Sequence, residues 1–221
     1  MKNTSPSLRY FGAFPDAFIE HIHQLIAIGY VDALPRIKVN DKKANEEPSI
    51  TGFIITALTN RKMSLTPSPR WIMRYSFHDN FPVEHDGRIG SDRLMPDIII
   101  EISDIGLPQF IIESKRLLKG QSTAGNYTGS EGMGCFIDGR YAGRYSEAGM
   151  LGYVQSDSIE VWAKKVREKI DKSSDELNLA IPQQTVNFHP QIQHEWVSIH
   201  KRMTSEGRSI KIYHILLDCI V

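Results

Sequence analysis

Two short apolar segments that also carry acidic residues constrain the fold of this chain most strongly. The first, residues 96–102, reads PDIIIEI, and the second, residues 109–115, reads QFIIESK. Isoleucine-rich runs of this length predict buried β-strands. The Leu-Pro pair at 107–108 predicts a turn between them. We therefore expect the two segments to pair as neighbouring strands of one sheet.

Helical and extended patterns alternate along the rest of the chain. Apolar spacing predicts helices over 14–28, 46–60, 135–141 and 158–173, with Gly29 ending the first and Pro48 in the first turn of the second. Further strands are predicted over 71–77 and 148–154, a C-terminal β-hairpin over 195–219, and a loop over 174–193. These elements indicate one α/β domain over 1–221, with a core at about 46–170 and an N-terminal helical extension at 1–45.

The composition excludes several classes of protein. Of the 221 residues, 41% are hydrophobic and 24% are charged, which is typical of a globular protein and not of a disordered or fibrous chain. No stretch approaches about eighteen consecutive apolar residues, so we expect no membrane span. The first residues lack the pattern of a secretory signal, and Cys135 and Cys219 are the only cysteines. We therefore expect a cytoplasmic protein with reduced thiols.

The net charge of zero conceals an uneven distribution of charge. A neutral total argues against a protein that coats nucleic acid by bulk attraction. However, residues 76–113 carry a net charge of minus six, while residues 61–75 and 114–145 carry plus four and plus three. Acids placed in loops for solubility are the alternative explanation of this pattern. The two basic segments on either side of the acidic one are compatible with a local surface that binds nucleic acid.

The acids of the two apolar segments are expected to converge. Side chains alternate between the two faces of a strand, so Asp97 shares a face with Glu101, and Glu113 shares a face with Lys115. If the strands pair, Asp97 and Glu113 meet at one edge of the sheet, beside Lys115. Two neighbouring carboxylates repel each other unless a cation lies between them, and oxygen ligands of this kind are those that Mg²⁺ prefers. An interstrand salt bridge of Lys115 with Asp97 or Glu101 is the open alternative.

Such a group of side chains has the chemistry needed to hydrolyse a phosphodiester. Carboxylates hold a divalent ion that activates water and neutralises the leaving oxyanion. A lysine beside them orients the water or stabilises the negative charge that develops on phosphorus.

The two segments resemble the central motif of the PD-(D/E)xK nuclease superfamily. The resemblance is carried by Pro96-Asp97 with its apolar run, by the hairpin-length gap and by Glu113-Ser114-Lys115 followed by a basic residue, and it covers about residues 46–170. It implies a restriction-endonuclease-like core, with a central mixed β-sheet flanked by helices. It further implies that Asp97 and Glu113 are metal ligands and that Lys115 is the catalytic lysine. The family places a further acid on an earlier helix, for which Glu47 is the candidate and Glu46 the competitor.

The resemblance also implies an activity. We expect a DNA endonuclease that depends on Mg²⁺ or Mn²⁺, in prokaryotic antiviral defence, restriction or repair, with RNA left open as a substrate. A homodimer and a partner subunit of a defence complex are both left open. The alternative function is a catalytically inactive nuclease-fold subunit that serves as a binding or assembly module.

Basic and aromatic residues after the second segment are candidates for nucleic-acid binding. They are Arg116, Lys119, Arg140, Arg144 and Tyr141, with Tyr127 and Tyr145 as further stacking candidates. Cations of this kind bind backbone phosphates, and aromatic rings stack on bases. The alternative for each residue is a solvated surface position. The basic run at 164–169 is interpreted in the same way, as a solvated helix face.

Overall fold

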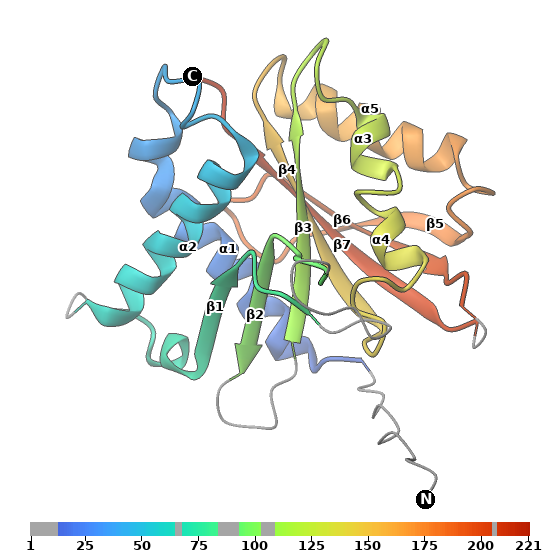
Figure 1. The fold of residues 1–221 in the computed structure, drawn as a ribbon, viewed down its shortest axis with the longest axis horizontal. Helices are drawn as coiled ribbons and strands as arrows, with labels where there is room; N and C mark the ends of the chain where they lie inside the picture. Colours follow the sequence, from blue (N-terminus) through green and yellow to red (C-terminus); the bar gives the residue numbers. More distant parts are fainter. Residues whose placement is uncertain (1–12, 65–67, 84–92, 103–108, 205–206) are drawn as a thin grey trace, which may run out of the picture.

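A seven-stranded mixed sheet organises the fold (Figure 1). The structure is a computed structural model that describes residues 13–64, 68–83, 93–102, 109–204 and 207–221. Its strands are β1 (Tyr75–Asp79), β2 (Ile98–Ile102), β3 (Gln109–Leu117), β4 (Glu147–Val154), β5 (Leu179–Val186), β6 (His194–Lys201) and β7 (Ser209–Asp218). Their order across the sheet is β1-β2-β3-β4-β7-β6-β5. Strand β4 is parallel to both β3 and β7, and the other pairs are antiparallel.

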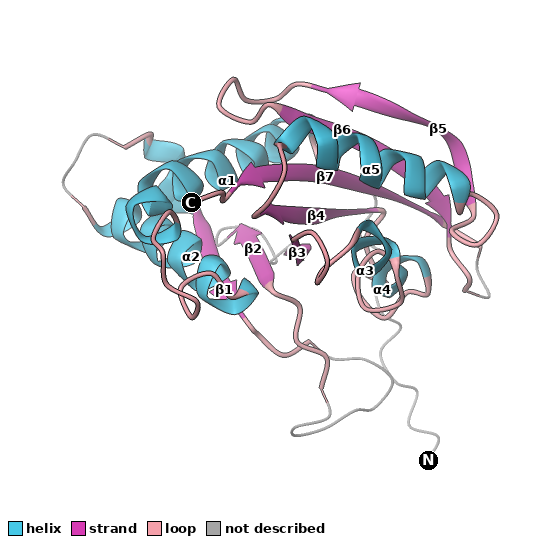
Figure 2. Ribbon diagram, turned by 90° about the horizontal axis from the view of Figure 1, so that it is seen from above, coloured by secondary structure: helices cyan, strands magenta, loops and turns pink. Residues whose placement is uncertain are grey.

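Helices cover both faces of the sheet (Figures 1 and 2). The helices are α1 (Asp16–Ile37), α2 (Glu47–Met63), α3 (Ala124–Thr128), α4 (Gly134–Ile137) and α5 (Ile159–Lys172), with a 3₁₀-helix at Arg70–Arg74. The side chain of Tyr213 contacts His23 of α1, whereas the next residue, His214, contacts Tyr127 of α3. Successive residues of a strand point to opposite faces, so α1 and α3 lie on opposite sides. The expected α/β class, a mixed sheet flanked by helices, is confirmed.

The strand pairing predicted from the two apolar segments is also confirmed. Strands β2 and β3 pair antiparallel, with Ile98 opposite Ile112 and Ile100 opposite Phe110. These four side chains are at most 1% exposed, as expected for a strand pair covered on both faces. The predicted turn at 107–108 lies outside the described residues.

The first helix is longer than predicted because Gly29 does not end it. Helix α1 continues to Ile37, with Pro35 in its last turn. A Cβ atom at Gly29 would lie 2.9 Å from side-chain atoms of Ile54 and Leu58 in α2. The glycine therefore allows two helices to approach closely, which is a tertiary requirement that local sequence signals do not distinguish from a helix stop.

Two other predicted elements are corrected by the structure. The region predicted as a strand over 71–77 begins with the 3₁₀-helix, and extended backbone starts at Tyr75. The predicted loop over 174–193 contains β5, an edge strand with Pro182 in it. An edge strand needs only one hydrogen-bonded side and tolerates proline, so its polar sequence resembles that of a loop.

The two ends of the described chain belong to the same core as its middle. Strands β6 and β7 form the predicted C-terminal hairpin, and β7 also pairs with β4 inside the sheet. Apolar side chains of α1 are buried in one hydrophobic cluster with those of the sheet. None of the helices in the described ranges combines the length and the apolar character needed to cross a membrane.

We predict that Gly152→Ala destabilises the protein. A Cβ atom at this position in β4 would lie 2.3 Å from Leu216 Cδ2 and 2.8 Å from Leu117 Cδ1, both in the packed core. We expect the free energy of unfolding to fall by about 1–3 kcal/mol, measured by urea denaturation, because overpacking forces neighbouring side chains to move. Gly52→Ala is the control: its Cβ has room inside α2, and it should raise stability by about 0.5–1 kcal/mol. Equal effects of the two variants would contradict this packing.

Candidate active site

The free edge of β3 positions two of the predicted acids. Pairing with β2 ends at Ile98 and Ile112, whereas β3 continues to Leu117. Beyond that point the backbone N–H of Ser114 donates to Asp97 Oδ2 at 2.7 Å, and the N–H of Arg116 donates to Glu47 Oε2 at 2.8 Å. Buried backbone donors must be satisfied, and here carboxylates replace the missing strand. Asp97 and Glu47 therefore line the same short stretch of β3.

Lys115 contacts two carboxylates, those of Glu113 and Glu47. Its Nζ lies 2.7 Å from Glu113 Oε1 and 3.4 Å from Glu47 Oε1. The alternation of side chains along the strand explains why Glu113 and Lys115 share a face, as predicted. Glu47, and not the exposed Glu46, is the helix acid that reaches the group.

The salt bridge considered for Lys115 in the sequence has different partners in the structure. Glu101 contacts His78 Nε2 at 3.4 Å and accepts a hydrogen bond from the side chain of Gln109, so it lies apart from the group. The register explains this separation, because Glu101 is opposite Gln109 at the start of β3, four residues before Glu113. Lys115 is paired with Glu113 and Glu47 instead.

A hydroxyl network, which sequence reasoning missed, holds Asp97 from the opposite face of β3. The fully buried Ser114 donates its side-chain hydroxyl to Asp97 Oδ2 at 2.7 Å. Thr51 Oγ1 of α2 lies 3.3 Å from Ser114 Oγ and 2.9 Å from the hydroxyl of Tyr153. The available signal was the serine between Glu113 and Lys115, since strand alternation predicts that it points away from both.

Burial and mutual repulsion set the charges of the group. Glu113 is 6% exposed, and burial, together with the nearby charge of Asp97, raises its pKa to about 8 despite the opposing effect of Lys115. Burial also raises the pKa of Glu47, which Lys115 partly offsets. Burial alone would lower the pKa of Lys115, but Glu113 and Glu47 raise it above its ordinary value. The lysine is therefore charged at neutral pH while one of its partners is close to titration.

The donor atoms suit a hard divalent cation. Glu113 Oε2 is buried and has no hydrogen-bond partner in the described part of the chain. Asp97 contributes a second carboxylate, and both are oxygen ligands of the kind that Mg²⁺ and Mn²⁺ accept. Both oxygens of Glu47 already contact Arg116 and Lys115. Among the residues that the structure describes, no group of three or more His, Cys, Asp or Glu side chains is arranged as a metal site.

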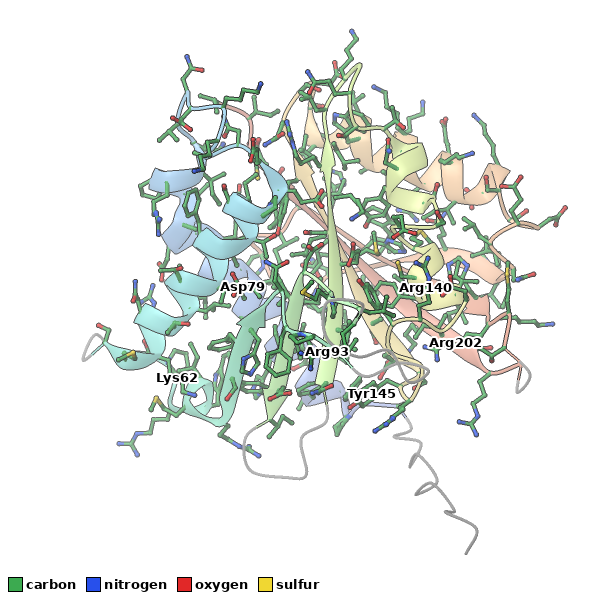
Figure 3. The ribbon with its side chains drawn as sticks, in the orientation of Figure 1. Lys62, Asp79, Arg93, Arg140, Tyr145 and Arg202 are labelled. Carbon is green, nitrogen blue, oxygen red and sulfur yellow. The ribbon has the colours of Figure 1, made fainter. Side chains whose placement is uncertain are left out.

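The cationic residues predicted to bind nucleic acid differ in how exposed they are and in whether other protein groups already contact them. Arg140, beside α4, is held by Asp138, Glu131 and the carbonyl of Ser130 (Figure 3). Arg116 Nε donates to Gln155 Oε1, and Arg144 is half-buried. Lys119 is exposed after the end of β3.

The three tyrosines predicted to stack on bases have buried rings. Tyr141 is 8% exposed and packs edge-on against Phe136, and Tyr127 is fully buried. Tyr145 is also buried, and its hydroxyl accepts a hydrogen bond from the backbone N–H of Gln109, at the end of the sheet where β3 begins (Figure 3). In this conformation the three rings contribute to the core and offer little surface to a base.

Comparison of the chain with family models, with curated proteins and with solved structures gave no match. What the geometry defines is a half-buried group of three carboxylates and one lysine at the free edge of a mixed sheet.

We predict that Glu113 makes the metal-free protein less stable as pH rises. Its folded pKa of about 8 exceeds the unfolded value, so its contribution is fully present below about pH 4.5 and is lost as pH rises through 8. The shift sets an upper limit of about 5 kcal/mol at about 1.4 kcal/mol per pKa unit, and solvent relaxation reduces the expected loss to about 2 kcal/mol. Urea denaturation from pH 5 to pH 8, with a chelator present, measures it. Glu113→Gln should remove most of this decline, and an identical decline in the variant would contradict the assignment.

Proposed function

We propose that the chain is a Mg²⁺-dependent DNA endonuclease of the PD-(D/E)xK type, built on a restriction-endonuclease-like core. The observation that carries the proposal is the position of Glu113 beside Asp97 and Lys115: it is a buried carboxylate with a raised pKa, and one of its oxygens has no hydrogen-bond partner among the residues that the structure describes. A buried acid that lacks full compensation is costly, and such groups are concentrated at functional sites.

Each side chain has a role in this proposal. Asp97 and Glu113 hold Mg²⁺ or Mn²⁺, and Glu47 is an additional ligand or a residue that orients Lys115. When bound, the ion activates water and neutralises the leaving oxyanion. Lys115 keeps its charge because two carboxylates raise its pKa, and it stabilises negative charge on the phosphate. Ser114 holds Asp97 in position through two hydrogen bonds to one oxygen, which leaves Asp97 Oδ1 without a protein partner in the described residues.

The order of the elements supports the finer fold assignment. Helix α2 supplies Glu47, the residue before β2 is Asp97, strand β3 supplies Glu113 and Lys115, and short helices lead to the parallel strand β4. This is the succession that the resemblance implies for residues 46–170. A cytoplasmic role in prokaryotic defence, restriction or repair, as a homodimer or as a subunit of a larger complex, belongs to the same proposal.

One observation favours a second function, a catalytically inactive nuclease-fold subunit that binds or assembles with other molecules. Lys115 Nζ contacts Glu113 Oε1 directly at 2.7 Å, so the protein itself places a cation where a metal ion would otherwise balance this carboxylate. The two functions differ in whether the carboxylates take up a cation.

A calorimetric Mn²⁺ titration tests metal binding. We expect the wild-type protein to bind Mn²⁺ and to release protons at pH 7, because the ion displaces the proton from Glu113, whose pKa is about 8. Glu113→Gln should weaken binding at least about tenfold. Glu101→Gln is the matched control, a carboxylate on the adjacent strand outside the group, and should leave the affinity unchanged. Absence of Mn²⁺ binding by the wild-type protein would reject the endonuclease and favour the inactive subunit.

A nuclease assay on plasmid DNA with Mn²⁺ tests catalysis. Lys115→Ala should reduce cleavage by about 100-fold or more, because it removes the charge beside the scissile phosphate. Lys164→Ala, at an exposed position on α5, should cleave at the wild-type rate. Circular dichroism verifies that each variant is folded. Cleavage that is unchanged in both Lys115→Ala and Asp97→Ala would place the activity elsewhere.

A further inference from the structure

A basic groove of about 390 Å³ lies between the connection that follows β3 and helix α5. Four lysines line it, Lys119 from the connection and Lys165, Lys169 and Lys172 from α5, and Trp162 forms part of its wall. We call these five residues and the space between them the lysine groove. The sequence suggested only a solvated helix face for this part of α5. The tertiary structure adds Lys119, which comes from a segment more than forty residues earlier.

The lysine groove carries an excess of positive charge that the described residues neutralise only in part. Among the described residues that line it, Glu168 is the single acid. Lys172 lies 3.6 Å from Glu168, and Lys165 lies 3.1 Å from Asp157, but these are exposed pairs of little energetic value. An anion can therefore replace the carboxylates at little cost.

The spacing of the lysines suits a row of phosphates. Lys165, Lys169 and Lys172 follow one another at intervals of four and three residues, so they share one side of α5. They span about 10 Å at a rise of about 1.5 Å per residue. Each strand of B-form DNA carries a phosphate about every 3.4 Å along the duplex axis, so a row of lysines of this length can face more than one phosphate.

Trp162 stabilises the shape of the groove. Its ring is 3% exposed, its indole N–H donates to the carbonyl of Ser156, and Lys165 Nζ lies 4.6 Å from the ring centre. A cation held over an aromatic ring is already ordered before a ligand arrives. The ring is too buried to insert into a lipid layer, and the described residues that line the groove include no exposed large apolar side chain. These features favour a nucleic-acid backbone over a membrane surface.

The lysine groove is continuous with the candidate active site along the chain. Lys119 follows Lys115 by four residues, which corresponds to about 13 Å of extended backbone. Strand β3 leads directly to the region where α3 packs against α5 (Figure 1). The backbones of Lys115 and Lys119 are therefore at most about 13 Å apart, which is close enough for one polymer to reach both.

We propose that the lysine groove binds the phosphate backbone of a nucleic-acid strand and holds it beside the candidate active site, without reading its sequence. The identity of the polymer rests on the proposed nuclease function, whereas the binding of phosphates by these lysines does not require catalysis.

Binding of fluorescein-labelled DNA in the presence of EDTA tests the proposal without cleavage. Fluorescence anisotropy is measured between about 50 and 200 mM salt for duplex and single-stranded DNA. The test variant is Lys119→Gln with Lys169→Gln. The control is Lys164→Gln with Lys201→Gln, which removes the same charge from exposed positions that do not line the groove. Thermal unfolding verifies that both remain folded.

We expect the test variant to bind DNA at least about tenfold more weakly and the control to bind as the wild type does. The slope of log K against log salt should decrease in magnitude by about 1.8 for duplex or about 1.4 for single-stranded DNA, because two phosphate contacts are lost. Equal losses in both variants, no loss in either, or no binding by the wild type would overturn the proposal. So would a test variant that loses only binding to phosphatidylserine vesicles. Salt-dependent DNA binding through these lysines, without Mn²⁺-dependent cleavage, would reject the nuclease and leave the groove assignment intact.

Discussion

The candidate site depends on the unpaired stretch of β3 that extends beyond β2. Strand β2 begins opposite Ile112, so the N–H groups of Ser114 and Arg116 need acceptors from outside the sheet. Asp97 and Glu47 provide them, one from the residue before β2 and the other from the start of α2. An unsatisfied buried N–H costs about 1–3 kcal/mol. The same hydrogen bonds that complete the sheet edge therefore collect negative charge at one place.

That collection of charge is only partly compensated by the protein. Lys115 contacts both Glu113 and Glu47, but Glu113 keeps a buried oxygen that has no hydrogen-bond partner in the described part of the chain, and its pKa is raised to about 8. A pair of buried ions is a weak stabiliser, and a proton or a divalent cation at Glu113 relieves the remaining repulsion from Asp97. Stability and metal binding are thus expected to be coupled through a single side chain. The lysine groove adds positive charge from the connection that follows β3 and from α5, so the neutral total charge separates into an acidic centre and a basic track.

Strong local patterns predicted their elements correctly, and ambiguous ones did not. The two isoleucine-rich segments pair as neighbouring buried strands, as their length and composition predicted, and Pro48 with the acids before it indicated the start of α2. Gly29 was misinterpreted because a glycine that permits helix packing and a glycine that ends a helix look alike in sequence. Strand β5 was missed because an edge strand is polar on its exposed surface. The tyrosines proposed to stack on bases are buried in the structure. Composition alone does not distinguish a buried tyrosine from an exposed one.

The sequence by itself determined which residues of the candidate site share a strand face. Alternation along β3 places Glu113 with Lys115 and turns Ser114 to the other side, and it depends only on extended backbone geometry. The tertiary structure alone decided which distant groups meet that face. Glu47 reaches Lys115 because the start of α2 lies against the free edge of β3, and Lys119 joins the lysines of α5 because α3 packs on that helix. These contacts span tens of residues, and they are set by the packing of the hydrophobic core and by unsatisfied backbone donors, which no local pattern encodes.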